Sequence, residues 1–351
     1  MIPLSIADIA EITGGSLDCV SDPDQRVTGF MEFDSRKVTK GGLFLALPGA
    51  RVDGHDYAEK AIEQGAVAVL AARPVGVPAV VVKPQGKVTG DAANADIYAN
   101  DEDGSAAAVV QALSDIAREV TRRLTAEQGL EIVGVTGSAG KTSTKDLLAT
   151  IFRADGETVA PPGSFNNEVG LPYTALRCDE HTRFLVAEMS ARGIGHIRHL
   201  TTITAPTVGV VLNVGTAHLG EFGSRENIAQ AKGELVEALP AAAEGGVAVL
   251  NADDPFVAGM APRTAAKVVY YSANKPPAGD AQYYASDIQL DDVARPSFVL
   301  HAPGTHPLPI KLQVFGKHQV SNALAAAAAA IESGIEPQVV ANALSCLLYT
   351  S

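Results

Sequence analysis

The stretch "VGVTGSAGKTSTKD", residues 133–146, decides the fold of this chain. It begins with a short apolar run that is typical of a buried strand, and a glycine-rich turn and the start of a helix follow. Gly137 and Gly140 allow successive backbone N–H groups to converge on phosphate oxygens, while the helix N-terminus adds positive potential. Lys141 can reach the β- and γ-phosphates, and the Thr142 hydroxyl can bind Mg²⁺. The spacing predicts a strand, a phosphate-binding loop and a helix.

A strict phosphate loop has the pattern GxxxxGK[ST], but this chain carries Val135 where that pattern has its first glycine. Without a ligand, the same turn would be an ordinary glycine-rich connection between a strand and a helix. The Gly-Lys-Thr triplet at a strand–helix junction favours phosphate binding over that alternative. The predicted nucleotide-binding residues of the loop are Gly137, Ser138, Ala139, Gly140, Lys141, Thr142 and Ser143.

The composition excludes several classes of protein. The chain has 351 residues, a formal net charge of -13 and 46% hydrophobic residues, which suits two or three domains with sizeable cores. So acidic a chain is unsuited to nucleic acid or to an anionic membrane surface. Its start has no basic segment of a signal peptide, and its most uniform apolar run, residues 323–331, is too short to span a bilayer. Because Cys19, Cys178 and Cys346 are scattered, we expect a soluble protein in the reducing cytoplasm.

The order of the expected elements indicates an α/β protein. Strands and helices alternate over residues 130–250, which predicts a mainly parallel sheet, and residues 268–315 have a more hairpin-like pattern before two final helices. Residues 1–85 predict a smaller α/β unit. The expected domains are an N-terminal substrate-binding domain over residues 1–105 with a linker loop at 83–105, a central ATP-binding domain over 106–345, and a tail over 346–351.

Two polar side chains follow predicted strands of the central domain. Glu188 ends the apolar run "FLVAE", and His218 lies in the loop after the next strand. Ligand sites in open α/β sheets lie at the carboxyl ends of the strands, so Glu188 is a candidate Mg²⁺ ligand rather than a solvated carboxylate. A single loop histidine is more often an ordinary surface residue, but beside Glu188 it becomes a candidate ligand.

Lys232 falls inside the apolar stripe of a predicted helix. Ile228, Ala231, Leu235 and Leu239 form that stripe in "ENIAQAKGELVEAL". One interpretation is a lysine whose stem covers apolar surface while its ammonium reaches water. The other is a buried lysine of lowered pKa that reacts with CO₂ to form a carbamate, which would bind a metal. The sequence alone leaves both open.

Two further polar groups follow apolar segments. Asn251 comes directly after the strand in "VLNADDP", where its amide could contact a base edge or simply belong to a turn. The second group lies at the start of a predicted helix, where His318, Gln319 and Asn322 precede or interrupt a run of small residues.

The glycine-rich turn and the polar residues described after it occur in the same order as in the Mur ligase central domain. Over about residues 130–340 the chain therefore resembles that domain. The resemblance implies catalytic roles for Lys141, Glu188, His218 and Lys232. It implies that Glu188 and His218 bind Mg²⁺ together with Thr142 and with Lys232 as a carbamate. It also implies that Asn251 lies near adenine, with His318 and Asn322 in the nucleotide site. Gln319 stands where the family pattern has asparagine.

The N-terminal stretch "FDSRKVTKGGLFLALPGARVDGHDYAEKAIEQGAVAVL" is similar to the uridine-diphosphate-binding domain of the two Mur ligases that act last. The resemblance places Asp34, Ser35 and Arg36 near the nucleotide-sugar, where arginine and a hydroxyl suit a diphosphate, although a polar turn would have a similar sequence. The segment "GSFNNEVGLP", residues 163–172, matches the Asn-Asn-Glu pattern of the members that add D-alanyl-D-alanine, so Asn166 and Asn167 are candidate substrate-binding residues.

The resemblance implies an ATP-dependent, ADP-forming peptide ligase that uses ATP and two Mg²⁺ ions. Its partners would be UDP-N-acetylmuramoyl-tripeptide and D-Ala-D-Ala, and we expect a monomer that binds neither nucleic acid nor membrane. Alternatives are a member that adds diaminopimelate or lysine, a P-loop nucleotide-binding module without ligase activity, and an inert remnant. Since family members carry a third, C-terminal domain and this chain ends near its expected start, we expect the 351-residue polypeptide to have little or no turnover.

Overall fold

The computed structural model describes residues 1–49, 52–84, 86, 98, 101–217, 219–274 and 277–346. It divides into two compact units, of which the first comprises Met1–Gly129 with Asn167–His181 and the second comprises Leu130–Asn166 with Thr182–Ser351. Both units are built from sheets and helices, so the predicted α/β class with a mainly parallel central sheet is confirmed.

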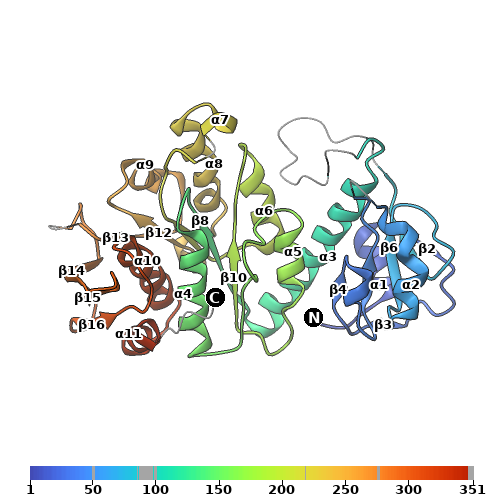
Figure 1. The fold of residues 1–351 in the computed structure, drawn as a ribbon, viewed down its shortest axis with the longest axis horizontal. Coiled ribbons are helices and arrows are strands. Elements are labelled where there is room, and N and C mark those ends of the chain that lie inside the picture. Colours follow the sequence, from blue (N-terminus) through green and yellow to red (C-terminus); the bar gives the residue numbers. More distant parts are fainter. Residues whose placement is uncertain are drawn as a thin grey trace. The chain divides into compact units, whose positions relative to one another are not determined.

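The first unit contains a five-stranded sheet (Figure 1). Four of its strands are parallel, and β2 joins the edge antiparallel to β7. The strand order is β2 (Ser16–Asp18), β7 (Ala79–Val81), β6 (Ala68–Ala71), β5 (Leu43–Leu45) and β4 (Met31–Glu32), and β1 (Leu4–Ser5) pairs separately with β3 (Arg26–Val27). Its helices are α1 (Ile6–Thr13), α2 (Ala58–Glu63), α3 (Ser105–Gln128) and α5 (Gly170–Ala175), with short 3₁₀ turns η1 (Ser35–Lys37) and η2 (Gly54–Tyr57).

The compact units do not follow the domain limits expected from the sequence. The long helix α3 packs with α1 and α5, so it groups with the first unit, and so does the segment Asn167–His181. The expected boundary after residue 105 therefore stays a prediction about domains. Most of the expected linker loop, residues 85, 87–97, 99 and 100, and the tail residues 347–351 lie outside the described residues.

A nine-stranded sheet forms the second unit. Its order is β16 (Leu308–Lys311), β15 (Pro296–His301), β14 (Tyr283–Leu290), β13 (Lys267–Ser272), β12 (Val247–Asn251), β11 (Val208–Val211), β8 (Glu131–Thr136), β10 (Phe184–Glu188) and β9 (Thr158–Val159). The strands from β9 to β14 are parallel to their neighbours, and β15 and β16 continue the sheet as antiparallel strands. This matches the parallel core and the hairpin-like segment that the sequence predicted.

The strand order reverses at β8. From β8 the chain passes through α4 (Lys141–Arg153) to the edge strand β9, returns to β10, and then continues on the other side of β8 with β11. In open parallel sheets, a crevice forms at the carboxyl ends of the strands where the order reverses, and ligands bind there. The glycine-rich turn that follows β8 lies at this position.

Helices cover both faces of the central sheet (Figure 1). On one face lie α4, α10 (His318–Glu332) and α11 (Pro337–Cys346), and on the other lie α6 (His196–Thr204) and α8 (Arg225–Glu237). Smaller elements complete the unit: α7 (Leu219–Phe222), α9 (Pro255–Ala258), η4 (Ala242–Glu244) and η5 (Ala261–Arg263). The two faces are distinguished along β8, where Val133 and Val135 join the α4/α10 core while Gly134 faces Leu235 of α8.

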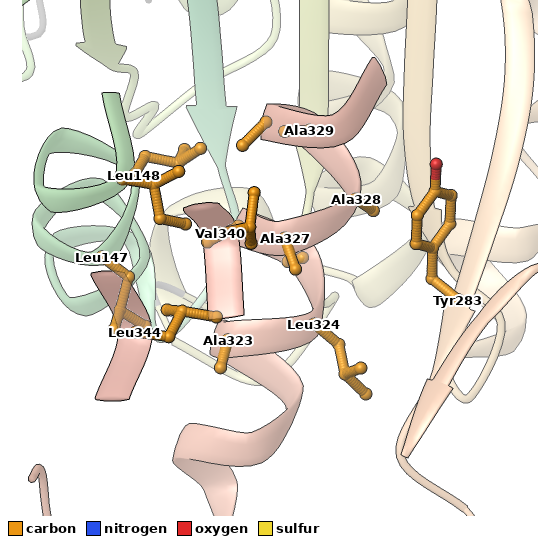
Figure 2. Close-up of a cluster of buried hydrophobic side chains, with 14 of the residues drawn as sticks. Leu147, Leu148, Tyr283, Ala323, Leu324, Ala327, Ala328, Ala329, Val340 and Leu344 are labelled. Carbon is orange, nitrogen blue, oxygen red and sulfur yellow. The ribbon is translucent and has the colours of Figure 1, made fainter. Parts of the chain in front are cut away.

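Small residues set how closely the helices approach the sheet. Gly134 and Gly209 are paired in neighbouring strands, and a Cβ at Gly134 would lie 2.9 Å from the side chain of Leu235. On the opposite face, the alanines of α10 are fully buried against α4 and α11 (Figure 2). Close packing of this kind gains many weak dispersion contacts and fixes the helices against the sheet. As a result, α8 and α10 hold their polar residues at defined positions near the end of β8.

Across the described part of the chain, the helices are too short or too polar to cross a bilayer.

Candidate functional site

The glycine-rich turn connects β8 directly to α4, as the sequence predicted. Gly140 has a φ of 84°, a left-handed conformation that favours glycine. A Cβ at this position would lie 2.5 Å from Oδ1 of Asn322, and one at Gly137 would lie 2.8 Å from Cβ of Leu212. Close neighbours therefore require glycine at both positions, and at Gly140 the backbone conformation requires it as well. Through Asn322, the first turn of α10 is brought against the turn.

Asn213 holds the turn from the side of β11. Its Oδ1 accepts a hydrogen bond from the Ala139 N–H at 2.9 Å, and its Nδ2 donates to the Ala139 carbonyl at 3.0 Å. The Ser138 N–H donates to the Asn213 carbonyl at 3.0 Å, and the Ser138 Oγ accepts from the Gly215 N–H at 2.9 Å. The role of Asn213 was not predicted from the sequence. The feature that could have indicated it is the position of Asn213 just after a strand, β11, that neighbours β8.

Replacing Asn213 with alanine is expected to weaken ATP binding about 30-fold, because two hydrogen bonds of about 1 kcal/mol each shape the turn. Isothermal titration with ATP measures the change. The control is Gln282→Ala, since Gln282 also accepts a hydrogen bond from a backbone N–H, that of Tyr270 at 2.7 Å, but away from the turn. Equal ATP affinity in Asn213→Ala and the wild type would contradict the role of Asn213.

Lys141 lies in the first turn of α4, and its Nζ donates to the Gly137 carbonyl at 3.0 Å. Burial lowers the pKa of Lys141, while the negative charge of Glu188 acts in the opposite direction. Thr142 Oγ1 lies 3.3 Å from Ser164 Oγ, and Ser143 belongs to the same first helical turn. The predicted lysine and threonine thus both lie at the N-terminus of α4, where a phosphate group would be bound.

Glu188 is the last residue of β10 and is paired in register with Val135 of β8. Only 1% of it is exposed. Its Oε1 accepts a hydrogen bond from Asn166 Nδ2 at 2.7 Å, whereas its Oε2 is buried without a hydrogen-bond partner among the described residues. A buried carboxylate oxygen with no donor is costly unless a cation binds it, so this oxygen fits a divalent metal.

Lys232 is buried in α8, with 4% of the residue exposed. This burial disagrees with the interpretation in which the stem of Lys232 covers apolar surface while its ammonium reaches water. Burial, and after it the positive charge of Lys141, lower the pKa of Lys232 to about 7. The same Lys141 charge interacts with Glu188, so the three side chains belong to one electrostatic environment. Near neutral pH a substantial part of the Lys232 population is a neutral amine, the form that reacts with CO₂.

The described residues contain no group of three His, Cys, Asp or Glu side chains that could hold a metal ion. His218, the predicted imidazole ligand, lies outside the described residues. The predicted donors that the structure describes are Thr142, Glu188 and Lys232, and Lys232 becomes a donor only when it is deprotonated or modified. Their metal-binding role stays a prediction.

Of the predicted nucleotide-site residues, Asn251 and Asn322 make hydrogen bonds within the fold. Asn251 donates through Nδ2 to the Leu212 carbonyl at 2.8 Å and accepts from the Asp253 N–H at 2.9 Å. His318 is exposed at the start of α10. Asn322 Nδ2 donates to Gln319 Oε1 at 2.9 Å, so Gln319 orients the amide that lies against Gly140. The roles of Asn251, His318 and Asn322 toward a nucleotide stay predictions.

Asn166 and Asn167 make different contacts. Asn166 uses both ends of its amide, because Nδ2 donates to Glu188 and Oδ1 accepts from Ser190 Oγ at 2.9 Å. Asn167 Oδ1 accepts from the Val169 and Gly170 N–H groups at 3.3 and 2.9 Å, which fixes the start of α5. Neither contact tests the predicted substrate-binding role. The structure adds a positioning role for Asn166 that the sequence did not indicate.

In the first unit, Asp34, Ser35 and Arg36 line a pocket of about 530 Å³. Arg36 donates to both carboxylate oxygens of Asp34, from Nε at 2.9 Å and from Nη2 at 2.8 Å, and this holds the pKa of Asp34 at about 2. The pocket also contains aromatic and basic side chains that sequence analysis did not select. They are Phe33, Tyr57 and Lys60.

Comparison with protein families identifies two matching regions. The model described as "Mur ligase middle domain" matches residues 135–330, and the model described as "Mur ligase family, catalytic domain" matches residues 28–124.

Characterised relatives agree with these matches. The UDP-N-acetylmuramoyl-tripeptide--D-alanyl-D-alanine ligase of Mycobacterium tuberculosis is 54% identical over 348 residues, which cover 98% of this chain and 66% of that protein. The ligase of the same name from Escherichia coli is 32% identical, with 95% of this chain and 66% of that protein covered. The chain thus spans 66% of the length of both relatives.

Solved structures give the same result. MurF from Acinetobacter baumannii superposes with a TM-score of 0.82 at 26% identity and covers 99% of this chain and 69% of that one. MurF ligase from Thermotoga maritima in complex with ADP has a TM-score of 0.68 at 27% identity and covers 92% of this chain and 67% of that one. The family match over residues 135–330 and these relatives show that the chain belongs to the Mur ligase family.

Proposed function

We propose that this chain provides the nucleotide-sugar and ATP sites of an ATP-dependent ligase that joins D-Ala-D-Ala to UDP-N-acetylmuramoyl-tripeptide. The observation that carries the proposal is the buried Glu188 carboxylate beside the turn after β8, with one oxygen held by Asn166 and the other without a donor. The names of the relatives that share this chain's sequence support the substrates. A member that adds diaminopimelate or lysine, and a P-loop module without ligase activity, are not favoured by those relatives.

The proposed reaction begins with transfer of the γ-phosphoryl group of ATP to the terminal carboxylate of the tripeptide, which gives ADP and an acyl phosphate. The amine of D-Ala-D-Ala then attacks the acyl carbon, and the tetrahedral intermediate expels phosphate and leaves an amide bond. Because one anion is transferred to another, the main task of the protein is to offset negative charge and to orient the reactants. No nucleophilic side chain is needed.

Individual residues suit these tasks. Lys141 and the N–H groups of the turn would bind the β- and γ-phosphates, and Asn213 and Asn322 would hold the turn in shape. Thr142 and Glu188 would hold Mg²⁺, which when bound supplies positive charge to the phosphates. We further propose that His218 completes this set and that a second Mg²⁺ binds when Lys232 carries a carbamate.

The pocket of the first unit would bind the UDP portion of the substrate. Its aromatic side chains Phe33 and Tyr57 offer surfaces for a base, while Arg36 and Lys60 offer positive charge for a diphosphate. We also propose that the protein acts as a monomer in the cytoplasm, where ATP and nucleotide-sugars are available.

Two measurements test the proposed function. Isothermal titration of the 351-residue chain should show independent binding of Mg-ATP and of UDP-N-acetylmuramoyl-tripeptide, with no binding of the free tripeptide. Any phosphate release with ATP and the UDP-tripeptide should rise with D-Ala-D-Ala and not with diaminopimelate or lysine. Failure to bind the UDP-tripeptide, or stimulation by another amine, would contradict the proposal.

A further inference from the structure

Lys145 is a buried lysine of α4 and has no role in the proposed reaction. It lies one turn after Lys141, and only 3% of it is exposed. Its Nζ donates to the Pro161 carbonyl at 2.9 Å and to the Gly163 carbonyl at 3.2 Å, and lies 2.8 Å from Asp146 Oδ1. An ammonium has three N–H donors, so these three acceptors satisfy it completely. A buried charge that is fully bonded in this way imposes a strict geometry on its partners.

The two carbonyl partners belong to the segment 161–166, which makes contacts with both α4 and Glu188. Beyond Gly163, Ser164 Oγ lies 3.3 Å from Thr142 Oγ1. At the end of the segment, Asn166 donates to Glu188 and accepts from Ser190 Oγ, and its carbonyl accepts from the Ser190 N–H at 3.0 Å. The segment is thus attached at one end to α4 and at the other to the residues that end and follow β10.

This arrangement makes Lys145 an anchor for the proposed metal site. Thr142 and Lys145 are three residues apart on α4, so they lie on the same face of the helix. Asn166 is the only described hydrogen-bond donor to the Glu188 carboxylate that the structure identifies. The position of Asn166 therefore controls the orientation of that carboxylate, and Lys145 fixes the segment that carries Asn166.

We propose that Lys145 is a positioning residue that fixes the segment 161–166 and, through Asn166, orients Glu188 for the metal that accompanies ATP. The proposal rests on the proposed function, because it takes Glu188 as a ligand of that metal. It adds a link between the phosphate-loop helix and the Asn-Asn-Glu segment. Lys145 acts through other residues and contacts neither ATP nor Mg²⁺ itself.

The test compares ATP affinity with and without magnesium. Isothermal titration gives the dissociation constant of ATP in EDTA and in excess Mg²⁺. The constant in EDTA divided by the constant in Mg²⁺ measures the contribution of the metal to ATP affinity. Lys145→Met should lower this ratio about tenfold, as expected when a metal ligand loses its outer support. ATP affinity in EDTA should change less than twofold, because the turn and Lys141 remain. General damage to the ATP site would lower both affinities.

The matched control is Asp146→Asn. It removes the negative charge of the exposed partner of the same ammonium but leaves both carbonyl contacts, so the ratio should stay within twofold of the wild type. Thermal melting establishes that each variant is folded. If Lys145→Met does not fold, Lys145→Gln replaces it in the same titrations, and the ratio should still fall because this side chain is shorter and uncharged and bonds the two carbonyls more weakly.

A double-mutant cycle with Asn166→Ala tests the route of the effect. If Lys145 acts through Asn166, the ratio of ATP dissociation constants should be no lower in the double variant than in Asn166→Ala alone. Multiplication of the two single effects, or an unchanged ratio in Lys145→Met, would overturn the positioning role while leaving the proposed function intact. If Mg²⁺ does not change the ATP affinity of the wild type, so that the ratio is one, both the metal site of the proposed function and this inference are overturned.

Discussion

Replacing Gly140 with alanine is expected to weaken ATP binding by about 100-fold, equivalent to about 2.7 kcal/mol. Two costs combine at this position. The φ of 84° is strained for any residue with a Cβ, and the added Cβ would lie 2.5 Å from Asn322 Oδ1. Since the Asn322 amide is itself held by Gln319, it cannot move away without breaking that hydrogen bond. The turn would shift instead, and its N–H groups would no longer converge on the phosphates.

The control for this prediction is Gly334→Ala. Gly334 has a φ of 86°, and a Cβ there would have no atom within 4 Å, so this change introduces the same strain without the close contact. We expect it to reduce the free energy of unfolding by about 1 kcal/mol and to leave ATP affinity unchanged. Isothermal titration and thermal melting measure both variants. Wild-type affinity in Gly140→Ala would show that the close contact with Asn322 does not matter.

Replacing Lys232 with methionine should have opposite effects on stability and on function. Burial lowers the pKa of Lys232 from 10.5 to about 7, so at neutral pH the unfolded chain binds this proton more tightly than the folded chain. The buried amine therefore destabilises the fold below pH 10.5, and the penalty is greatest at and below pH 7. Methionine has no such penalty, and we expect a gain of a few kcal/mol at pH 7.

The pH dependence gives this prediction its sign. Between pH 7 and 10.5 the folded chain has lost the Lys232 proton while the unfolded chain retains it, so this group makes stability rise with pH by up to about 1.4 kcal/mol per unit. Urea denaturation of the wild type in CO₂-free buffer should show that rise, and Lys232→Met should lack it. Lys267→Met is the control, because Lys267 is exposed and should leave the pH dependence unchanged. Identical pH profiles for the wild type and Lys232→Met would contradict a buried, low-pKa lysine.

The functional effect of the same substitution is a loss. Carbamate formation needs the neutral amine, so bicarbonate should raise the Mg²⁺-dependent affinity of the wild type for ATP, and more so at pH 8 than at pH 6. Lys232→Met should be insensitive to bicarbonate at both pH values. Isothermal titration in buffers with and without bicarbonate measures this, and an equal response in both proteins would exclude the carbamate.

The parts of the site that the sequence could predict are encoded locally. The turn from Gly137 to Thr142 has a fixed spacing between a strand and a helix, and glycine suits the left-handed conformation at Gly140. Glu188 ends an apolar strand, so its place at the strand end followed from the sequence, and Lys232 interrupts a helical apolar stripe, which gave burial as one of two interpretations. The sheet class followed from the alternation of strands and helices.

The parts that the sequence could not predict depend on contacts between distant segments. Asn213 meets Ala139 only because β11 lies beside β8, and nothing in the local sequence gives that strand order. The contacts of Lys145 depend on the path of the chain after α4. Likewise, α3 packs with α1 and α5, which places it in the first unit although its sequence continues into β8.

The central claim is that Thr142, Glu188 and Lys232 belong to one Mg-ATP site at the carboxyl end of β8. A crystal structure of this chain with Mg²⁺ and a non-hydrolysable ATP analogue tests it most directly. We expect the phosphates on the N–H groups of residues 138–142 and a metal bound to the carboxylate of Glu188. Phosphates bound elsewhere, or a metal that does not contact Glu188, would contradict the account.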